Sequence, residues 1–330
     1  MGRVDSGEPE QITRVSVIIP VRDDPRLLQC VRSVLARRDE VDELEVIAVD
    51  HRCSPAFRAD VLACLPAGAR VVRFDGETVY GARKRGVEEA DGQVLFFTDA
   101  DCVIRPGWIA EALRTLRAGA DLAQGFSGSL ERSRGDLLMQ RRYEAHLKRL
   151  PPGEGTECDT RNLAVRRGVV DRVSFPASWR RTGDTYLGLL AEANGFTVAY
   201  SPAMRVDHAH NTDLPVFIAK QICHGWGAQR IMQEHPEVQW HGGHLRLVAR
   251  VARSSRRFPG QRALARLLGA GMIRTAWVIE RTLPVVPLPV AAWALLAADK
   301  GGALAGHLLF EAGADEPRLS DLLDRPGIVG

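Results

Sequence analysis

The sequence lacks the cysteine pattern of a disulfide framework and the apolar leader of a secreted chain. Its six cysteines form no Cys-x-x-Cys pair and no regular spacing. In a chain of 330 residues this arrangement is typical of unpaired thiols in a reducing compartment. Residues 1–11 are polar and acidic, unlike a secretory signal peptide. We therefore expect a cytoplasmic protein.

The sequence also has no run that is well suited to span a membrane. Residues 282–298 carry no charge, but this stretch lies at the lower limit of length for a transmembrane helix. Pro284, Pro287 and Pro289 interrupt its first half, and prolines break the backbone hydrogen bonding that a lipid-exposed helix needs. We therefore predict no transmembrane helix there.

Two nucleotide-binding fingerprints are absent as well. No Gly-x-Gly-x-x-Gly follows the first apolar run, which excludes the common dinucleotide motif. Gly81 and Gly86 have the glycine spacing of a P-loop, but Val87 and Glu88 replace the required Lys and Ser or Thr. A nucleotide would therefore have to bind without either phosphate cradle.

The sequence does contain an alternation of short apolar runs with helical periodicities over residues 14–119. This order favours an α/β fold with a doubly wound, mostly parallel sheet. Residues 125–128 are rich in glycine and indicate a turn after a further strand. The expected strands are 15–20, 44–49, 70–74 and 94–97, and the expected helices are 25–37, 79–90, 106–119, 133–150 and 185–194.

The apolar run Val94–Phe97 is followed by two carboxylates, Asp99 and Asp101. A continuous apolar run is typical of a strand buried inside a parallel sheet, and open α/β sheets bind ligands beyond the carboxyl ends of their strands. Two carboxylates on a short loop suit Mg²⁺ or Mn²⁺ that also contacts a substrate diphosphate. The alternative is that Asp99 caps a turn and Asp101 is solvated, because Asp-x-Asp is common by chance.

Several motifs in sequence order resemble the family 2 glycosyltransferases, which have the GT-A fold. The resemblance covers about residues 14–230. It rests on Val15–Pro20, the strand that ends at Asp50, Ala82–Gly86 and Phe97–Asp101. It implies an inverting transfer of a sugar from a nucleotide-diphosphate donor, with Mg²⁺ or Mn²⁺ bridging the Asp-x-Asp motif and the diphosphate.

The resemblance also implies residues for the donor site. The nucleotide-sugar side would be lined by Pro20, Asp50, Arg83 and Asp99. Asp50 would contact the nucleobase and Arg83 the nucleotide. Two positions depart from the family pattern, because His51 stands where a second acidic residue is common and Lys84 where asparagine is common. These departures leave the nucleobase of the donor open.

Asp184 precedes the expected helix at 185–194. The matching position of the family carries the catalytic base, and an inverting transfer needs one carboxylate to take the proton of the acceptor hydroxyl. Gly183 departs from the family, which usually has an acidic residue there. The simpler interpretation is capping, since the helix dipole favours Asp at an N-terminus.

Two further positions are candidates for contacts with the acceptor. Asn162 lies in a stretch that resembles the strand framing the acceptor pocket, and a hydrogen bond to strand-end backbone is the alternative. Trp226 falls where the family closes over the diphosphate and the acceptor, and a core tryptophan is the alternative. The resemblance thus assigns acceptor binding to Asn162 and Trp226.

His208 and His210 lie two residues apart after an expected strand at 198–200. On an extended segment both would face the same side. Some GT-A enzymes supply a histidine here as a third metal ligand, so His208 is our candidate for that role. A contact with the diphosphate and a structural role are the alternatives.

The last third of the chain is basic in one part and apolar in another. No acidic residue lies between Glu237 and Glu280. One helical face there would carry Arg246, Arg250, Arg253 and Arg257. Beside the apolar segment 282–298, such a face is typical of a peripheral protein on an anionic leaflet, at the inner face of the membrane. The alternative is a solvated face with the apolar segment packed on the domain.

The acceptor class stays open between a small molecule, a glycan and a lipid-linked sugar, and membrane contact would favour the last. Nucleic acid is not expected, because no interleaved aromatic residues accompany the arginines. We divide the chain into a disordered lead-in (1–13), a GT-A domain (14–235) and a helical extension (236–330). Within the domain, 14–128 is the nucleotide-sugar and metal half and 129–235 the acceptor half.

Two other functions stay open. A sugar-phosphate nucleotidyltransferase also uses an α/β sheet, a nucleotide and a metal, but it normally has a glycine-rich loop after the first strand, and residues 21–25 contain no glycine. A non-catalytic nucleotide-sugar-binding protein or membrane scaffold on the same fold would keep the metal pair. It would, however, tolerate the loss of Asp184.

Overall fold

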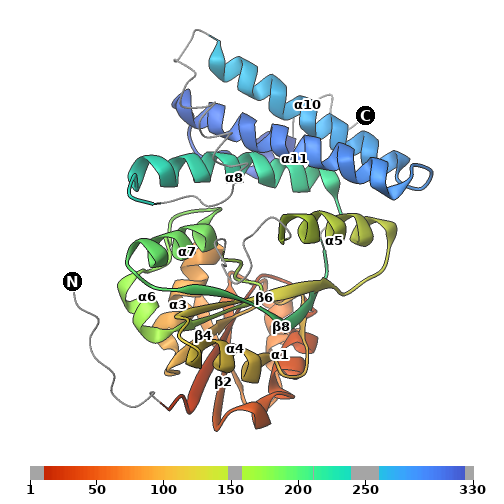
Figure 1. Cartoon of the computed structure of the whole chain (residues 1–330). Coiled ribbons are helices and arrows are strands. Elements are labelled where there is room, and N and C mark those ends of the chain that lie inside the picture. The colour runs from red at the N-terminus through yellow and green to blue at the C-terminus, as the bar shows by residue number, and fades with distance from the viewer. Residues whose placement is uncertain (1–10, 148–157, 211, 239–259, 324–330) are drawn as a thin grey trace. The chain divides into compact units, whose positions relative to one another are not determined.

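Figure 1 shows the computed structural model of the chain, which describes residues 11–147, 158–210, 212–238 and 260–323. Packing divides them into two compact units. The first unit takes the described residues of 1–130 and 151–208, and the second takes those of 131–150 and 209–330. The predicted boundary after residue 235 follows the end of α8, but by packing this helix groups with the later ones.

The first unit is an α/β structure and the second is helical. In chain order, the first contains β1 (Arg14–Val21), α1 (Leu27–Leu35), η1 (Arg38–Glu40), β2 (Glu43–His51), α2 (Pro55–Asp60), η2 (Leu62–Cys64), β3 (Ala69–Phe74), α3 (Val79–Glu89), β4 (Val94–Phe97), β5 (Cys102–Ile104), α4 (Trp108–Arg117), β6 (Leu122–Ser129), β7 (Leu163–Arg166), α6 (Arg167–Arg172), α7 (Gly183–Ala193) and β8 (Val198–His208). The second contains α5 (Arg134–Leu147), α8 (Leu214–Glu234), α10 (Gln261–Thr282), α11 (Leu288–Glu311) and α12 (Leu319–Leu323).

The strands of the first unit form one mixed sheet with the order β3-β2-β1-β4-β7-β6-β8-β5. The pairs β3–β2, β2–β1, β1–β4 and β6–β8 are parallel, whereas β4–β7, β7–β6 and β8–β5 are antiparallel. Helices lie on both sides of this sheet (Figure 1). The predicted α/β fold with a doubly wound, mostly parallel sheet is therefore confirmed, while the antiparallel strands were not foreseen.

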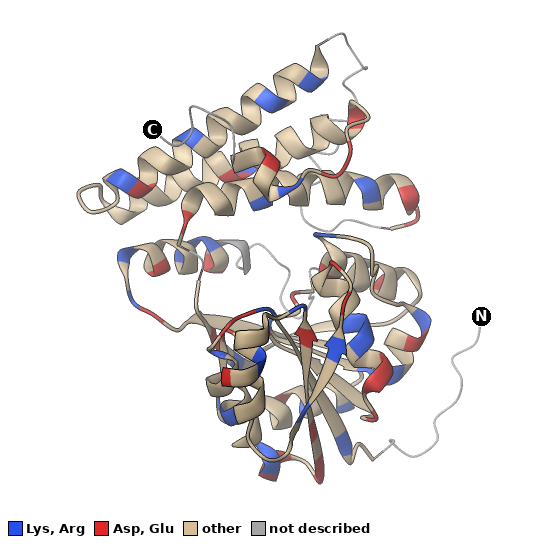
Figure 2. Ribbon diagram, turned by 180° about the vertical axis from the view of Figure 1, so that it is seen from behind, with Lys and Arg blue, Asp and Glu red and all other residues tan. Residues whose placement is uncertain are grey.

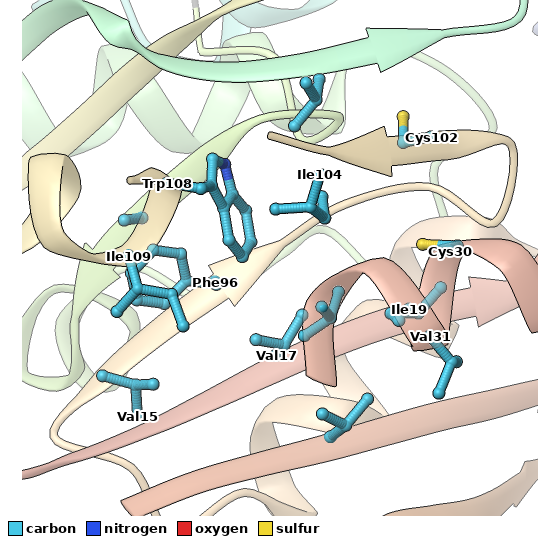
Figure 3. Packing of buried hydrophobic residues seen from close by; sticks show 14 of the residues in the cluster. Val15, Val17, Ile19, Cys30, Val31, Phe96, Cys102, Ile104, Trp108 and Ile109 are labelled. Atoms are coloured by element: carbon cyan, nitrogen blue, oxygen red, sulfur yellow. The ribbon is translucent and has the colours of Figure 1, made fainter. Parts of the chain in front are cut away.

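The alternation of side chains along β1 explains how helices cover both faces of the sheet. Val17 and Ile19 pack in a cluster with residues of α1 and α4, and Figure 3 shows them together with Trp108. Ile18 points the other way, towards α3, where a Cβ atom on Gly86 would lie 2.4 Å from its Cγ2 atom. Because both faces of the strand are buried, its sequence is a continuous apolar run.

In the second unit, α8 and α11 approach each other closely. A Cβ atom on Gly225 would lie 2.0 Å from the carbonyl oxygen of Ala303, and one on Gly306 would lie 2.0 Å from that of Ile222. These glycines therefore let the two helix backbones touch. Buried apolar residues of α5, α8, α10 and α11 form one cluster. Figure 2 shows long uncharged stretches on these helices, drawn in tan.

One expected turn is a strand. Residues 125–128 lie inside β6, with a register shift against β8 between Gly125 and Phe126. The prediction of a turn was wrong because β8, which is distant in sequence, pairs with these glycines. Residues 151–155, which are rich in proline and glycine, and the predicted arginine face at 246–257 lie outside the described residues.

None of the helices in the described ranges combines the length and the apolar character needed to cross a membrane. The uncharged segment 282–298 comprises the end of α10, a short connection and the start of α11. The prolines of that connection therefore separate two helices, and they do not kink one.

Replacing Gly86 with alanine tests how closely α3 must approach β1. The added Cβ atom would lie 2.4 Å from Ile18 and 3.2 Å from Val49, and both are stiff β-branched side chains of the sheet. We expect the free energy of unfolding, measured by urea denaturation, to fall by about 2 kcal/mol. Gly168→Ala is the matched control, because nothing lies within 4 Å of that Cβ position in α6. Equal effects of the two substitutions would contradict this account.

Candidate active site

The aspartates of the Asp-x-Asp motif lie in the turn that leaves the middle of the sheet. β4 ends at Phe97, and Asp99 and Asp101 connect it to β5. The amide of Cys102 donates a hydrogen bond to the carbonyl of Asp99, which closes the turn. The turn thus follows the carboxyl end of β4, next to the parallel strand β1, where α/β sheets bind ligands.

Each of these aspartates is held by a cationic or histidine side chain. Nη2 of Arg83, which is only 4% exposed, donates to Oδ1 of Asp99 over 2.6 Å. Oδ2 of Asp101 lies 3.3 Å from Nε2 of His208 and 3.8 Å from Nη2 of Arg26. Burial raises the pKa of Asp99 in spite of Arg83. Burial acts on Asp101 as well, but the hydrogen bond with His208 and the nearby positive charges, among them Arg26 and Arg161, together outweigh it and lower the pKa of that carboxyl.

The pair suits a divalent cation that takes further ligands from a substrate. Within the described ranges, no group of three or more His, Cys, Asp or Glu side chains is arranged to hold a metal ion by itself. Mg²⁺ needs only one or two carboxylates when substrate phosphates and water complete its octahedron. Oδ2 of Asp99 accepts no hydrogen bond from a described residue, so its lone pairs are available. The donor set of Asp99 and Asp101 therefore fits Mg²⁺ or Mn²⁺.

His208 connects the Asp-x-Asp turn to a second ion pair. It pairs with Cys102 across β8 and β5, which places it beside Asp101. Its Nδ1 lies 3.3 Å from Nη1 of Arg161, whose Nε donates to Asp159 over 2.8 Å. A guanidinium only donates, so Nδ1 accepts and the proton of the neutral ring sits on Nε2, facing Asp101. A metal bound at Nε2 would need the opposite tautomer, so the role of His208 as a metal ligand stays a prediction.

His210 does not share the surroundings of His208. β8 ends at His208, so His210 lies beyond the strand and the premise of one extended segment does not hold. His210 belongs to the second unit, where its Nε2 lies 2.9 Å from Oε1 of Gln140 on α5. The spacing of the two histidines therefore carries no information about a shared site.

Asp184 lies in the first turn of α7, and Thr182 is the N-cap residue. Oδ1 of Asp184 accepts hydrogen bonds from the amide of Thr185 at 3.0 Å and from the hydroxyl of Tyr80 at 3.1 Å. Thr182 has φ +62°, in the left-handed region that a β-branched residue rarely adopts. Burial and then the charge of Asp159 raise the pKa of Asp184. Backbone strain and a raised carboxyl pKa thus occur together at this helix start, as they often do at functional sites.

The carboxylate of Asp50 has partners for both oxygens. Nε of Arg58 donates to Oδ2 over 2.7 Å, and the amide of Cys53 donates to Oδ1 over 2.8 Å. Burial alone would raise the pKa of Asp50, but these hydrogen bonds lower it. The ring of His51 lies tilted by 44° against that of Phe74 with 5.8 Å between centroids, and its buried Nε2 has no hydrogen-bond partner in the described part of the chain. The nucleobase contact of Asp50 stays a prediction.

Pro20 lies inside β1, which continues to Val21, one residue beyond the expected end of the strand. Pairing with β4 ends at Ile18, and beyond that point β1 has only β2 beside it. A residue without an N–H group is tolerated where a strand has one open side. The role of Pro20 on the nucleotide-sugar side stays a prediction.

Asn162 is a fully buried link between four elements. Its Oδ1 accepts from Nε1 of Trp108 at 2.7 Å, and its Nδ2 donates to the carbonyls of Phe126 at 2.8 Å and Met204 at 2.9 Å. The side chain thus joins α4, β6 and β8 to the start of β7. With an exposure of 0%, it presents no atom to an acceptor in this conformation. Acceptor binding by Asn162 stays a prediction, and its contacts favour the structural alternative.

Trp226 belongs to the second unit and lies on α8. Its Nε1 donates to the carbonyl of Ala314 over 3.1 Å, and its ring meets that of Phe310 edge-on at 5.1 Å between centroids. These are the contacts of a core tryptophan, which was the alternative interpretation. An acceptor contact by Trp226 stays a prediction.

The sequence patterns did not reveal four side chains around the predicted site: Arg26, Tyr80, Asp159 and Arg161. Burial alone would raise the pKa of Asp159. The charge and hydrogen bonds of Arg161 nevertheless hold that pKa at about 2. The available signal for this pair was its position at the start of the stretch that resembles the strand framing the acceptor pocket. Tyr80 also left a signal, because it stands three residues before Arg83 and so shares a helix face with it.

Replacing Asn162 with alanine separates its two interpretations. The indole N–H of Trp108 and the carbonyls of Phe126 and Met204 would each lose a buried partner. We expect the free energy of unfolding to fall by about 3 kcal/mol in urea denaturation. Asn194→Ala, at the exposed end of α7, is the control and should cost less. A fully stable Asn162→Ala variant would contradict the structural role and favour acceptor binding.

The sequence is similar to a family model and to a known glycosyltransferase. The model of glycosyl transferase family 2 matches residues 16–174. Glycosyltransferase AglE of Haloferax volcanii is 25% identical over 199 residues, which cover 57% of this chain and 64% of AglE. The chain thus matches less than two thirds of the length of that relative.

The fold is similar to that of a protein of known structure. The crystal structure of GalNAc-T7 with UDP, GalNAc and Mn²⁺ matches with a TM-score of 0.50 and 14% identity, over 74% of this chain and 54% of that one. At this identity the likeness supports the fold alone, in agreement with the expected GT-A type of α/β sheet. The segment matched by the family model contains Asp50, Arg83 and the Asp-x-Asp motif. The matches over residues 16–174 therefore support a family 2 glycosyltransferase, which is the family that the motifs predicted.

Proposed function

We propose that the chain is a metal-dependent, inverting glycosyltransferase. It moves a sugar from a nucleotide-diphosphate donor to an acceptor hydroxyl. Asp99 and Asp101 hold Mg²⁺ or Mn²⁺ against the donor diphosphate, and Asp184 is the general base. The match of residues 16–174 to the family model and the likeness to a glycosyltransferase support the transferase class.

The observation that supports this proposal most is that α3 contacts both the Asp-x-Asp turn and Asp184. Arg83 donates to Asp99, and Tyr80, on the same face one turn earlier, donates to Asp184. Carboxylates from two separate segments therefore contact the same face of α3. A metal-binding pair and one further carboxylate are the minimal set for an inverting transfer.

The proposed chemistry is a single displacement. The acceptor oxygen forms a bond to the anomeric carbon as the bond from that carbon to the diphosphate oxygen breaks, and Asp184 takes the hydroxyl proton. Burial and Asp159 raise the pKa of Asp184, and a more basic carboxylate takes up a proton more readily. A bound metal ion supplies stabilisation for the negative charge on the leaving diphosphate, so a separate acid is not needed.

Arg83 also suits an anionic donor. Its Nε–H is buried and has no hydrogen-bond partner among the residues the structure describes. A buried donor without a partner is unfavourable, and a diphosphate oxygen would satisfy it. GalNAc-T7 was solved with UDP and Mn²⁺, which by analogy of fold supports a nucleotide donor and a divalent cation.

Donor hydrolysis tests the proposal. UDP-, GDP- and dTDP-sugars are incubated with Mn²⁺ or Mg²⁺, and the released nucleotide diphosphate is measured. We expect release from one donor class and its loss with EDTA. Asp101→Ala and Asp184→Asn should each lower the rate by about a hundredfold or more, since each removes a group that acts in the transition state. Asp75→Asn, at a side chain that is 70% exposed, is the control and should keep the rate.

One outcome would contradict the metal role, a second would contradict the general base, and a third would contradict the whole proposal. Release that is insensitive to EDTA would contradict the metal role. A full rate in Asp184→Asn would contradict the base and favour a non-catalytic nucleotide-sugar-binding protein. The whole proposal would fail if no donor were hydrolysed and calorimetry also detected no metal-dependent binding of UDP, GDP or dTDP.

We also propose that the second unit contacts an anionic membrane surface. Around the connection of α10 and α11, Val285, Val290 and Trp293 are 83%, 57% and 75% exposed. The basic residues of α10 are Arg262, Arg266, Arg274 and Arg281. Its one acidic residue, Glu280, accepts a hydrogen bond from the amide of Leu214. Exposed apolar side chains beside Arg281, with further arginines along α10, suit an anionic lipid surface, and such contact would favour a lipid-linked acceptor.

Vesicle co-sedimentation tests this contact. We expect the protein to bind vesicles that contain phosphatidylglycerol and not those of phosphatidylcholine alone, because arginines are attracted to anionic lipid. The double variant Val285→Ser with Trp293→Ser should bind about tenfold more weakly, since both side chains would lose apolar burial. Val71→Ser, an exposed valine of the first unit, is the control. Equal binding to both lipid compositions would contradict the contact.

A further inference from the structure

Tyr80 is a buried tyrosine whose hydroxyl donates to Asp184. It is 5% exposed, and its oxygen lies 3.1 Å from Oδ1 of that aspartate. Its ring stacks on Phe175 with 6.3 Å between centroids, and the guanidinium of Arg83 lies 5.4 Å from the ring centroid. These contacts fix the ring and therefore the direction from which the hydroxyl reaches the carboxylate.

The same ring explains the residue that precedes Asp184. A Cβ atom on Gly183 would lie 2.6 Å from Cγ of Tyr80 and 2.7 Å from its Cδ1. Real side chains do not approach a ring so closely, so any other residue at position 183 would have to displace the tyrosine. The glycine that departs from the family pattern is thus matched by a tyrosine that fills the space.

We propose that Tyr80 is a positioning residue for Asp184, and that position 183 must be glycine because the Tyr80 ring occupies the space of a side chain there. This inference rests on the proposed role of Asp184 as the general base. Tyr80 acts through Asp184 and does not contact the substrate.

The contacts distinguish the two oxygens of Asp184. Oδ1 accepts from the hydroxyl of Tyr80 and from the amide of Thr185. Oδ2 accepts no hydrogen bond from any residue in the described ranges. Two donors on one oxygen restrict the rotation of the carboxylate, so Oδ2 is the atom that takes the proton of the acceptor hydroxyl.

Charged groups face Asp184 from several elements. They are Asp159 from the segment before β7 and Arg83 from α3, while Arg181 from the segment before α7 acts on the adjoining Tyr80. Burial and Asp159 raise the pKa of Asp184, whereas the hydrogen bond from Tyr80 lowers it because it favours the charged carboxylate. Removing only the hydroxyl, with these groups in place, should therefore raise that pKa.

Tyr80→Phe removes the hydroxyl and keeps the ring. With the UDP-, GDP- or dTDP-sugar that the wild type hydrolyses, we expect kcat/KM to fall about tenfold, mainly through kcat, because Tyr80 does not contact the donor. The acid limb of the pH–rate profile should move to higher pH, since Asp184 loses a donor to its charged form. Tyr200→Phe, the same change on β8, should leave kcat/KM and the profile unaltered. A change in KM alone would overturn the positioning role.

A second readout needs no activity. Carbon-13 NMR of protein labelled in its aspartate carboxyls follows the titration of Asp184, with Asp184→Asn for assignment. We expect a higher pKa in Tyr80→Phe than in the wild type. An unchanged pKa would overturn the positioning role. A raised pKa in a protein that hydrolyses no donor would support the pairing of Tyr80 with Asp184 and overturn only the proposed function.

The requirement for glycine at position 183 has its own test. Gly183→Ala should raise the pKa of Asp184 by displacing Tyr80. In a Tyr80→Ala background the same substitution should have little further effect, because the clash is gone. Circular dichroism monitors folding, and if Gly183→Ala alone fails to fold, recovery of folding in the double variant supports the steric argument. Additive effects of the two substitutions, or no recovery, would overturn it.

Discussion

The ion pair between Arg83 and Asp99 is the interaction on which the rest of the site depends. Arg83 is 4% exposed, and its Nη2 lies 2.6 Å from Oδ1 of Asp99. A buried guanidinium that lost its carboxylate would destabilise the fold by on the order of 3 kcal/mol or more, because its charge would be left in an apolar environment. The pair therefore holds α3 against the turn between β4 and β5. Neither the helix nor the turn can shift without the other.

One stripe of α3 serves both parts of the proposed site. Tyr80, Arg83 and Gly86 recur every three residues and therefore share a helix face. Gly86 lets the helix approach β1 closely, and from that distance Arg83 reaches Asp99 and Tyr80 reaches Asp184. Backbone packing thus sets the separation, and the polar contacts depend on it. The face that packs inward contains a glycine and an arginine, which explains why it does not stand out as an apolar stripe in the sequence.

The sequence predicted what is encoded locally. A buried strand shows as a continuous apolar run, so β1 and β4 and the aspartates after β4 could be located. The contacts that complete the site could not be found this way, because they join distant segments. His208 reaches Asp101 only through the pairing of β8 with β5, and Asn162 joins three other elements. The glycines at 125–128 resemble a turn locally, and it is the pairing with β8 that makes them a strand.

The carboxyls of Asp159 and Asp184 interact, and their surroundings lower the pKa of the first and raise that of the second. Against the effect of burial, the charge and hydrogen bonds of Arg161 hold the pKa of Asp159 at about 2. Asp159 is therefore ionised at any working pH, and its charge adds to burial in raising the pKa of Asp184. Environments that separate the pKa values of two carboxyls give them different roles. Asp159 is a fixed anion, whereas Asp184 can exchange a proton. Arg161 thus acts on Asp184 indirectly, because it keeps Asp159 charged.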